Sequence, residues 1–413
     1  MNTQKKNSIL PLFITVFIDL LGLGIVIPIL SRVLLDPMHG ILPFDMVFST
    51  RTLILGFMIA CYPIAQFFGA PILGALSDRH GRKKTLIISL IGTLIGYILF
   101  AIGIMTQNIF LLFFSRTLDG FTGGNISIAL SAIADMSDEK SKAKNFGLIG
   151  MAFGLGFIIG PYVGGKLSDP TIVSWFNFAT PFWVAAILTF LNIIAVVIRF
   201  RETLKTKSNA KISPLTGFKN LYRAFQMPNL RVMFLVVFLL TFGFNFFTQF
   251  FQVFLIEKFN FSTSQIGDLF AFMGLWIAIT QGGITRPLSK ALSSKQILSY
   301  SVLLLAITFP FLLLPSQSWM IYLVIPFIAI FQGLTQPNST AIISNLSTAD
   351  SQGEILGINQ SIQSLGQALP PIIAGFIVSL NINLPTIVAA AATGLAWIIF
   401  FFFFRTQKAQ LSK

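Results

Sequence analysis

Three ionisable residues stand inside apolar segments of this 413-residue chain. Asp19 interrupts the run FIDLLGLGIVIP, and Arg116 and Asp119 lie in SRTLDGFTGGN. Charge in apolar surroundings is costly, so each of the three is a candidate functional residue. Arg116 and Asp119 are three positions apart, share one face of a helix and can pair. A carboxylate whose burial or distance from a cation changes can take up and release a proton.

Two interpretations of these charges stay open. In the first, Arg116 and Asp119 form a structural pair in which each neutralises the other. In the second, either Asp19 or Asp119 carries a proton and Arg116 is the modulating charge. A metal site is not expected, because Cys61 is the single cysteine and a lone thiol is no metal cluster.

The elements that position these residues are apolar helices. Hydrophobic residues make up 54% of the chain and charged residues 10%, and the mean hydropathy is +0.81. A membrane-spanning helix needs about 20 mostly apolar residues, and about twelve such stretches occur. The sequence therefore predicts an all-α membrane protein. The expected spans are 8–34, 50–75, 85–105, 108–134, 145–168, 174–200, 230–256, 262–286, 294–314, 318–345, 353–379 and 383–405.

Successive loops between the spans alternate between many and few Lys and Arg residues. The rich set holds Lys5, Lys6, Arg79, Arg82, Lys83, Lys84, Lys140, Lys142, Lys144, Arg199 to Arg231, Arg286, Lys290, Lys295, Arg405, Lys408 and Lys413. The poor set holds Arg32, Arg51, Lys166 and Lys258. Because basic loops stay inside, we expect a multi-pass protein of the plasma membrane, a bacterial inner membrane, with both termini cytoplasmic. The net charge of +14 is spread over these loops, so no nucleic-acid partner is expected.

The chain also contains an internal repeat. Gly333 and Asn338 stand 213 residues after Gly120 and Asn125. Gly366, Pro371 and Gly375 stand 210 residues after Gly156, Pro161 and Gly165. Two related halves are typical of transporters, with the substrate path expected between them. We expect two pseudo-symmetric six-helix bundles at 1–200 and 230–413, joined by a cytoplasmic linker at 201–229.

The loop GALSDRHGRKK, residues 74–84, gathers five formal charges. The positive-inside rule explains Arg82, Lys83 and Lys84. It does not explain Asp78 or the glycines at 74 and 81, since an acid among bases indicates a specific ion-pair network and glycine permits tight turns.

The expected fifth span, MAFGLGFIIGPYVGGKL, is rich in glycine. Gly156, Gly160 and Gly164 recur every four residues and form a smooth face for helix packing, which Pro161 interrupts. GPYVGGKL nearly fits a phosphate-binding loop, but Leu167 supplies no hydroxyl and no strand precedes it. The sequence contains no other nucleotide motif. We therefore expect a proton gradient, rather than a cofactor, to drive transport.

These patterns resemble the major facilitator superfamily, and especially its drug:proton antiporter branch. The family's loop pattern G-x-L-x-D-R-x-G-R-K/R-K/R is matched at eight positions, and R-x-x-x-G at Arg116 and Gly120 resembles a motif linked to proton transfer. The pattern D-x-x-G-x-G-x-x-x-P and the glycine-rich fifth span are similar to motifs of antiporters and exporters. The matching residues are Gly74, Leu76, Asp78, Arg79, Gly81, Arg82, Lys83 and Lys84 in the loop, Asp19, Gly22, Gly24 and Pro28 in span one, and Gly156, Gly160, Pro161, Gly164 and Gly165 in span five.

The resemblance implies a role for the loop as a conformational latch. The Asp78 position would lie against the positive end of span eleven, and Arg82 would pair with an acid that closes span four, here Asp135. The corresponding loop of the second half keeps Gly283 and Arg286 without an acid, so the latch is expected on one side only. For the intramembrane charges, the resemblance implies proton coupling through Asp19, Arg116 and Asp119.

Uncharged polar residues inside spans are the candidate substrate contacts. Amides among aromatic residues suit a large, partly apolar ligand, although hydrogen bonds between helices would explain any single one equally well. The candidates are Asn125, Asn245, Gln249, Gln252, Gln336, Asn338, Gln360 and Gln363.

The expected function is proton-coupled export of a small amphipathic, drug-like compound by alternating access, in a monomer that is not an enzyme. One alternative is the same fold moving a sugar, organic acid, siderophore or other metabolite, including as an importer. Another is a membrane receptor or assembly factor that transports nothing. Several tetracycline exporters carry an acid in span three, whereas GTLIGYILF here has none, so tetracycline itself is disfavoured.

Overall fold

The structure is a computed structural model that describes residues 9–38, 40–137, 139–204, 213, 215–228, 230–346 and 352–411. Lys5, Lys6 and Lys413 and most of the linker's first half lie outside these residues. Within them the chain is helical and contains no strand. The helices are α1 (Leu10–Leu35), α2 (Phe48–His80), α3 (Arg82–Met105), α4 (Ile109–Thr122), α5 (Asn125–Met136), α6 (Glu139–Leu167), α7 (Thr180–Arg199), α8 (Thr216–Gln226), α9 (Arg231–Phe259), α10 (Thr263–Ile279), the π-helical turn η1 (Thr280–Ile284), α11 (Thr285–Ala291), α12 (Ser294–Phe311), α13 (Ser318–Asn345), α14 (Gln352–Ile377) and α15 (Leu384–Leu411).

Nine helices in the described part of the chain are long and apolar enough to cross a membrane. They include α1, α2, α3, α7, α9, α12, α13 and α15, together with the continuous stretch from α10 through α11. The expected number of about twelve spans is therefore not confirmed. One reason lies in the expected span 108–134, which is not a single helix but the two short helices α4 and α5.

The junction between α4 and α5 is formed by Gly123 and Gly124. The Gln66 side chain of α2 donates a hydrogen bond from Nε2 to the Gly123 carbonyl oxygen, at 3.0 Å. A Cβ atom on Gly124 would lie 2.6 Å from the Ala70 Cα, so only glycine allows this approach to α2. The interruption thus leaves a backbone carbonyl that Gln66 satisfies, as buried backbone groups require.

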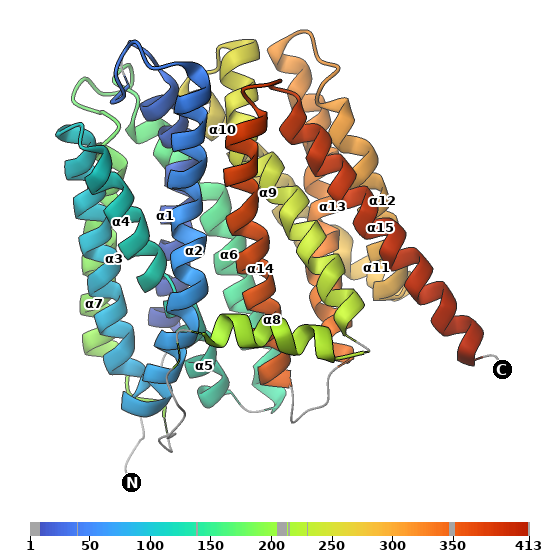
Figure 1. Ribbon diagram of the computed structural model, residues 1–413. Helices are drawn as coiled ribbons and strands as arrows, with labels where there is room; N and C mark the ends of the chain where they lie inside the picture. Colours follow the sequence, from blue (N-terminus) through green and yellow to red (C-terminus); the bar gives the residue numbers. More distant parts are fainter. Residues whose placement is uncertain are drawn as a thin grey trace. The chain divides into compact units, whose positions relative to one another are not determined.

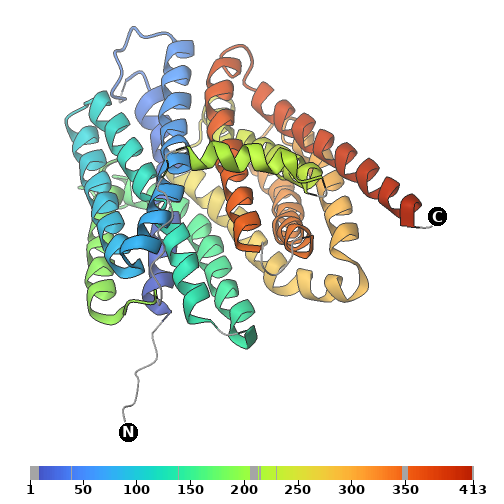
Figure 2. The same cartoon turned by 60° about the horizontal axis from the view of Figure 1, so that its bottom comes forward.

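The chain forms two compact units. Unit 1 comprises residues 1–44, 61–216 and 263–268, and unit 2 comprises residues 45–60, 217–262 and 269–413. The first turns of α2 thus belong to unit 2 and the first turns of α10 to unit 1. The elements can be followed by colour in Figures 1 and 2.

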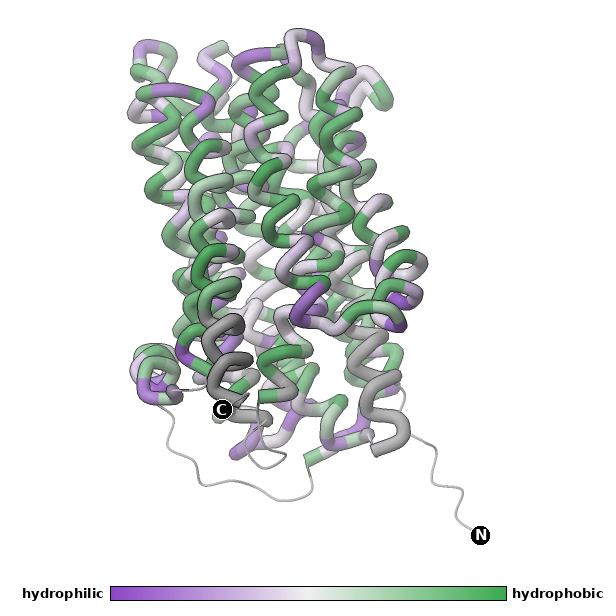
Figure 3. The backbone as a smooth tube through the Cα atoms, turned by 90° about the vertical axis from the view of Figure 1, so that its right-hand side faces the viewer, coloured by the Kyte–Doolittle hydropathy of each residue, from purple (hydrophilic) through white to green (hydrophobic). Residues whose placement is uncertain are grey.

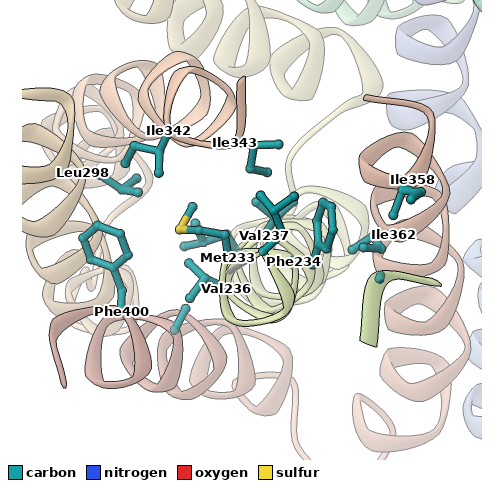
Figure 4. Packing of buried hydrophobic residues seen from close by; sticks show 14 of the residues in the cluster. Met233, Phe234, Val236, Val237, Leu298, Ile342, Ile343, Ile358, Ile362 and Phe400 are labelled. Carbon is teal, nitrogen blue, oxygen red and sulfur yellow. The ribbon is translucent and has the colours of Figure 1, made fainter. Parts of the chain in front are cut away.

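In unit 1, α1 packs along α6 and α7, and α3 packs against α4 and α7. In unit 2, α9 packs against α14 and α15, and α12 packs against α13 and α15. The apolar core of unit 2 gathers around the first turns of α9, where Met233, Phe234 and Val237 meet residues of the surrounding helices (Figure 4).

Large apolar side chains are also exposed along the spans, as lipid-facing positions require. Ile88 on α3, Phe190 on α7 and Phe327 on α13 are examples. Much of the helix length is accordingly hydrophobic in Figure 3.

The repeat found in the sequence corresponds to matching contacts. Gly165 of α6 packs on α10, where a Cβ atom would lie 2.8 Å from the Thr263 carbonyl oxygen. Its counterpart Gly375 of α14 packs on α2, where a Cβ atom would lie 2.6 Å from the Thr52 carbonyl oxygen. The Thr52 hydroxyl also donates to the Gly375 carbonyl oxygen, at 2.9 Å. Each half therefore supplies one glycine to one backbone contact of the same kind.

The glycine face of α6 packs against α1, as its spacing predicts. A Cβ atom on Gly160 would lie 2.6 Å from the Leu21 carbonyl oxygen and 2.8 Å from the Gly24 Cα. One on Gly164 would lie 2.6 Å from the Ile25 carbonyl oxygen. The two backbones are therefore in direct contact, and any larger residue would separate them.

We predict that Gly160→Ala destabilises the folded protein. Its methyl group would meet backbone atoms of α1, which cannot turn aside, so the free energy of unfolding should fall by about 1–3 kcal/mol. The measurement is the thermal unfolding midpoint of the purified protein in detergent.

The matched control is Gly154→Ala on the same helix, where a Cβ atom would meet nothing within 4 Å. This change should be neutral or stabilise by up to about 1 kcal/mol, because alanine favours a helix over glycine. Equal midpoints for the two variants would contradict the backbone contact.

Candidate functional site

The three intramembrane charges are all buried in unit 1. Asp19 on α1 is 3% exposed, and Arg116 and Asp119 on α4 are 4% and 6% exposed. The helix face expected for the pair is confirmed, because Arg116 Nη1 lies 3.6 Å from Asp119 Oδ2. Burial makes this contact far less screened than an ion pair on the surface.

A tyrosine completes the surroundings of Arg116. The guanidinium carbon lies 4.8 Å from the centre of the Tyr62 ring of α2, within the range of a cation–π interaction. Gly120 explains this approach, since a Cβ atom there would lie 2.7 Å from the Tyr62 Cα. The glycine of R-x-x-x-G thus brings α2 against α4 beside the arginine.

Asp19 is less well compensated than Asp119. Both of its carboxylate oxygens are buried and have no hydrogen-bond partner among the described residues. The amide of Asn125, at the start of α5, lies close enough to influence the carboxylate and is itself fully buried. A buried carboxylate without donors is costly in its ionised form. Asn125, a predicted substrate contact, therefore belongs to the neighbourhood of Asp19.

A second tyrosine, Tyr97 of α3, reaches α1 beside Asp19. Its phenol occupies the space above Gly22, where a Cβ atom would overlap the hydroxyl and lie 2.5 Å from Cζ. On the same helix, a Cβ atom on Gly96 would lie 3.0 Å from the Asp119 Cβ. Sequence reasoning missed Tyr62 and Tyr97. Gly22 and Gly120 were noted only as parts of motifs, although Gly22 leaves room for the Tyr97 ring and Gly120 for the backbone of Tyr62.

The candidate substrate residues of unit 2 bond mainly to their own helices. Asn245 donates to the Thr241 carbonyl oxygen and Asn338 to the Leu334 carbonyl oxygen, both at 2.8 Å. Gln252 donates to the Gln249 carbonyl oxygen at 3.0 Å, while its own Oε1 is buried without a partner in the described residues. Gln249, Gln360 and Gln363 are half-buried, and Gln336 is exposed. The hydrogen bonds of Asn245, Gln252 and Asn338 thus each run along one helix.

Arg82, the first residue of α3, is the centre of the loop network. Its Nε donates to Asp135 Oδ2 at 3.1 Å, which confirms the predicted partner at the end of α5. Its Nη1 donates to the Ser77 hydroxyl at 2.6 Å and also forms an ion pair with Asp78. The guanidinium is buried although the loop is not, so this arginine is bound specifically rather than solvated.

Glu202, just after α7, is a further member of this network that sequence reasoning missed. Its carboxylate accepts hydrogen bonds from the backbone N–H of Arg82 at 2.9 Å and of Lys83 at 3.1 Å. It therefore caps α3, because the first N–H groups of a helix have no partner in the helix and favour negative charge. Gly81 leads into this cap with φ +106°, where a Cβ atom would lie 2.5 Å from Glu202 Oε2. The position of Gly81 in the motif is thus explained by both its φ angle and the carboxylate beside it.

The remaining loop residues make fewer contacts. Arg79 is exposed, and Gly74 faces α5 with room for a Cβ atom 3.6 Å from the Ser127 hydroxyl. The expected contact of Asp78 with the start of span eleven would join the two units and stays a prediction.

The end of α6 carries an ion pair that follows the glycine motif. Lys166 Nζ lies 2.8 Å from Asp268 Oδ2 and donates to the Ser264 hydroxyl at 2.8 Å. Both side chains are about one-third exposed, so water reaches this pair. The pair fastens the first turns of α10 to α6 within unit 1.

The arrangement of apolar helices, related halves, a capped basic loop and buried charges defines a membrane transporter class. The sequence profile of the Major Facilitator Superfamily matches residues 12–309 and 233–413. The chain therefore belongs to the Major Facilitator Superfamily, and it is a multi-pass membrane protein.

Several curated relatives match over nearly their whole length. The chain is 30% identical to multidrug resistance protein 1 of Bacillus subtilis, with 95% of this chain and 97% of the relative covered. It is 29% identical to the class C tetracycline resistance protein of Escherichia coli, covering 96% and 94%. It is 26% identical to the quinolone resistance protein NorA of Staphylococcus aureus, covering 99% of both.

Solved structures show the same fold. The human organic anion transporter MFSD10 aligns with a TM-score of 0.72 and 21% identity, over 95% of this chain and 98% of the other. A D-xylose–proton symporter aligns with a TM-score of 0.74 and 14% identity, over 95% and 96%.

We predict that Glu202→Gln weakens the cap of α3. The substitution removes the negative charge and one of two acceptor oxygens, so the free energy of unfolding should fall by about 1 kcal/mol. Asp45→Asn, the loss of the same charge at an exposed loop residue, should not destabilise. Thermal unfolding of both variants is the measurement, and an unchanged midpoint for Glu202→Gln would rule out the cap.

We also predict that Gly22→Ala and Tyr97→Leu are coupled. The alanine alone should destabilise because its methyl group overlaps the phenol of Tyr97. With leucine at position 97 the phenol is gone, so the double variant should lose less stability than the two single losses added together, by at least about 0.5 kcal/mol. Additive losses in thermal unfolding would show that the two side chains do not meet.

Proposed function

We propose that this protein is a proton-coupled exporter of small amphipathic compounds that works by alternating access. The observation that supports this proposal most directly is the burial of the Asp19 carboxylate on α1 without a hydrogen-bond donor among the described residues. A buried carboxylate of this kind is costly as an anion. It loses its proton only when a ligand or a conformational change compensates the negative charge. Proton binding and release at this position is therefore coupled to whatever changes its surroundings.

The same geometry separates the roles of the two acids. Asp119 has Arg116 beside it on the same helix, whereas both carboxylate oxygens of Asp19 are without a hydrogen-bond partner among the described residues. In this proposal Asp19 carries the proton, and the Arg116–Asp119 pair sets the electrostatic field that the proton meets. Asn125 and Tyr97 position the carboxylate from α5 and α3.

The relatives support export of drug-like compounds, because their names describe resistance to tetracycline, to quinolones and to multiple drugs. The candidate substrate residues agree with such a ligand. Gln252 presents a buried carbonyl oxygen without a partner in the described chain, and the neighbouring face of α9 is rich in phenylalanine. An aromatic surface with amide acceptors suits a planar amphipathic compound that carries hydrogen-bond donors.

The loop network supplies the conformational part of the proposal. Arg82 holds the α2–α3 turn to α5 through Asp135, and Glu202 holds it to the exit of α7. Separating the members of this network would leave the Arg82 guanidinium unpaired, so the paired arrangement is favoured until another interaction compensates that charge. We propose that it opens and closes on the cytoplasmic side of the plasma membrane, with both termini on that side and a single chain as the functional unit.

The test compares Asp19→Asn with Asp45→Asn, the same change at an exposed loop residue. Inverted membrane vesicles that contain each variant are energised with a proton gradient, and accumulation of ethidium is measured. Asp19→Asn should reduce gradient-driven accumulation by about tenfold or more, while equilibrium binding of ethidium to the purified variant changes by less than about threefold. Asp45→Asn should behave as the unmodified protein.

Asp119→Asn tests whether the two acids have the different roles proposed for them. It leaves Arg116 buried without its carboxylate, so it should lower the thermal unfolding midpoint strongly, by an amount that corresponds to about 3–5 kcal/mol. Full active transport by Asp19→Asn would contradict the proposed carrier. Uptake into right-side-out vesicles instead of inverted ones would replace export by import.

A further inference from the structure

The linker between the two halves contains a helix that the sequence reasoning did not anticipate. Helix α8 spans eleven residues, TGFKNLYRAFQ, and is followed after a short turn by α9. In Figure 1 it runs across the direction of α9 and α14, which belong to the same unit. Its side chains fall into three faces of different chemistry.

The first face packs on unit 2. Ala224 is buried in the apolar cluster formed around the first turns of α9, and Leu221 packs against the same cluster. Asn220 donates from Nδ2 to the Ser361 hydroxyl of α14, at 3.1 Å. These contacts place α8 level with the first turns of α9, a membrane-crossing helix. Helix α8 therefore lies at the boundary between the bilayer and water.

The second face is apolar and exposed. Phe218, Tyr222 and Phe225 recur at helical spacing, and Leu215 extends the row by one turn. Their exposed fractions lie between 51% and 73%. Three aromatic side chains exposed in a row are unusual in contact with water, but aromatic residues are enriched where a membrane meets water.

The third face is basic. Lys219 and Arg223 are exposed and one helical turn apart, so they lie side by side next to the aromatic row. The helix contains no acidic residue. An aromatic face beside a basic face is the pattern of a helix that lies in the plane of a membrane surface. The two basic residues favour a membrane with anionic headgroups over one with only zwitterionic headgroups.

We propose that α8 is a binding surface for anionic phospholipids, with the aromatic row inserted among the acyl chains and Lys219 and Arg223 at the headgroups. Since α8 is fastened to α9 and α14, lipid bound there acts directly on the position of these two helices. This site is independent of Asp19 and of the proposed export, and it concerns the lipid and not the substrate.

The test is hydrogen–deuterium exchange of the full-length protein in nanodiscs of phosphatidylcholine alone and of phosphatidylcholine with phosphatidylglycerol. Binding to the closed helix slows its opening, so exchange of residues 216–226 should be slower with the anionic lipid. The difference should be about fivefold for each basic residue and should shrink in high salt.

The variant is Lys219→Gln/Arg223→Gln, and the matched control is Lys290→Gln/Lys295→Gln, which removes the same charge from exposed positions on α11 and α12. The first should abolish the effect of phosphatidylglycerol and the second should retain it. A thermal unfolding midpoint shared by both variants excludes a general folding defect as the cause.

A second readout tests insertion of the aromatic row. In a Phe225→Trp variant, brominated phosphatidylglycerol should quench tryptophan fluorescence more than brominated phosphatidylcholine does, beyond the quenching of the unmodified protein. Equal exchange of α8 in the two lipid compositions would overturn the proposal, and so would an anionic-lipid effect that persists in Lys219→Gln/Arg223→Gln.

Discussion

The direct contact between the backbones of α1 and α6 is the constraint on which unit 1 depends. Gly156, Gly160 and Gly164 present a surface without side chains, and α1 lies against it from Leu20 to Ile25. Asp19 is the residue immediately before this contact, so the backbone that carries its carboxylate is held by atoms that have no alternative rotamer. The remaining neighbours of Asp19 come from other helices: Tyr97 from α3 and Asn125 from α5. The glycine motif of α6 and the motif around Asp19 on α1 therefore act together, because α6 fixes the position of the part of α1 that carries the acid.

The two charged sites of unit 1 differ in how fully they are satisfied. Around Arg82, three carboxylates and a hydroxyl meet a guanidinium and the start of a helix, so nearly every polar group has a partner. Around Asp19, buried polar atoms remain without partners among the described residues. The first arrangement favours one stable geometry, because breaking it exposes unpaired charge. The second tolerates change, because little hydrogen bonding is lost when its surroundings move.

Much of the fold could be predicted from the sequence because apolar length and loop charge are strong, local signals. Most expected spans correspond to a helix with edges within a few residues, and the pairing of Arg82 with Asp135 followed from a motif resemblance. The interruption at Gly123 and Gly124 could not be predicted, since two glycines inside an apolar run are also compatible with a continuous helix. Glu202 was missed because its partners lie 119 and 120 residues away, and no local pattern connects a linker acid with the start of α3. Helix α8 was missed because a helix of eleven residues beside a basic linker gives no spanning signal.

The glycine contact between α1 and α6 consists of backbone atoms, the Leu20 Cβ atom and the Pro161 ring. None of these groups titrates or carries a net charge. Its strength therefore depends on shape and not on the ionisation of any group within it. The contact that holds these helices together contains no ionisable group, whereas Asp19, directly beside it, is ionisable. The side chains of Asp19, Arg116 and Asp119 could therefore change in evolution without altering this backbone contact.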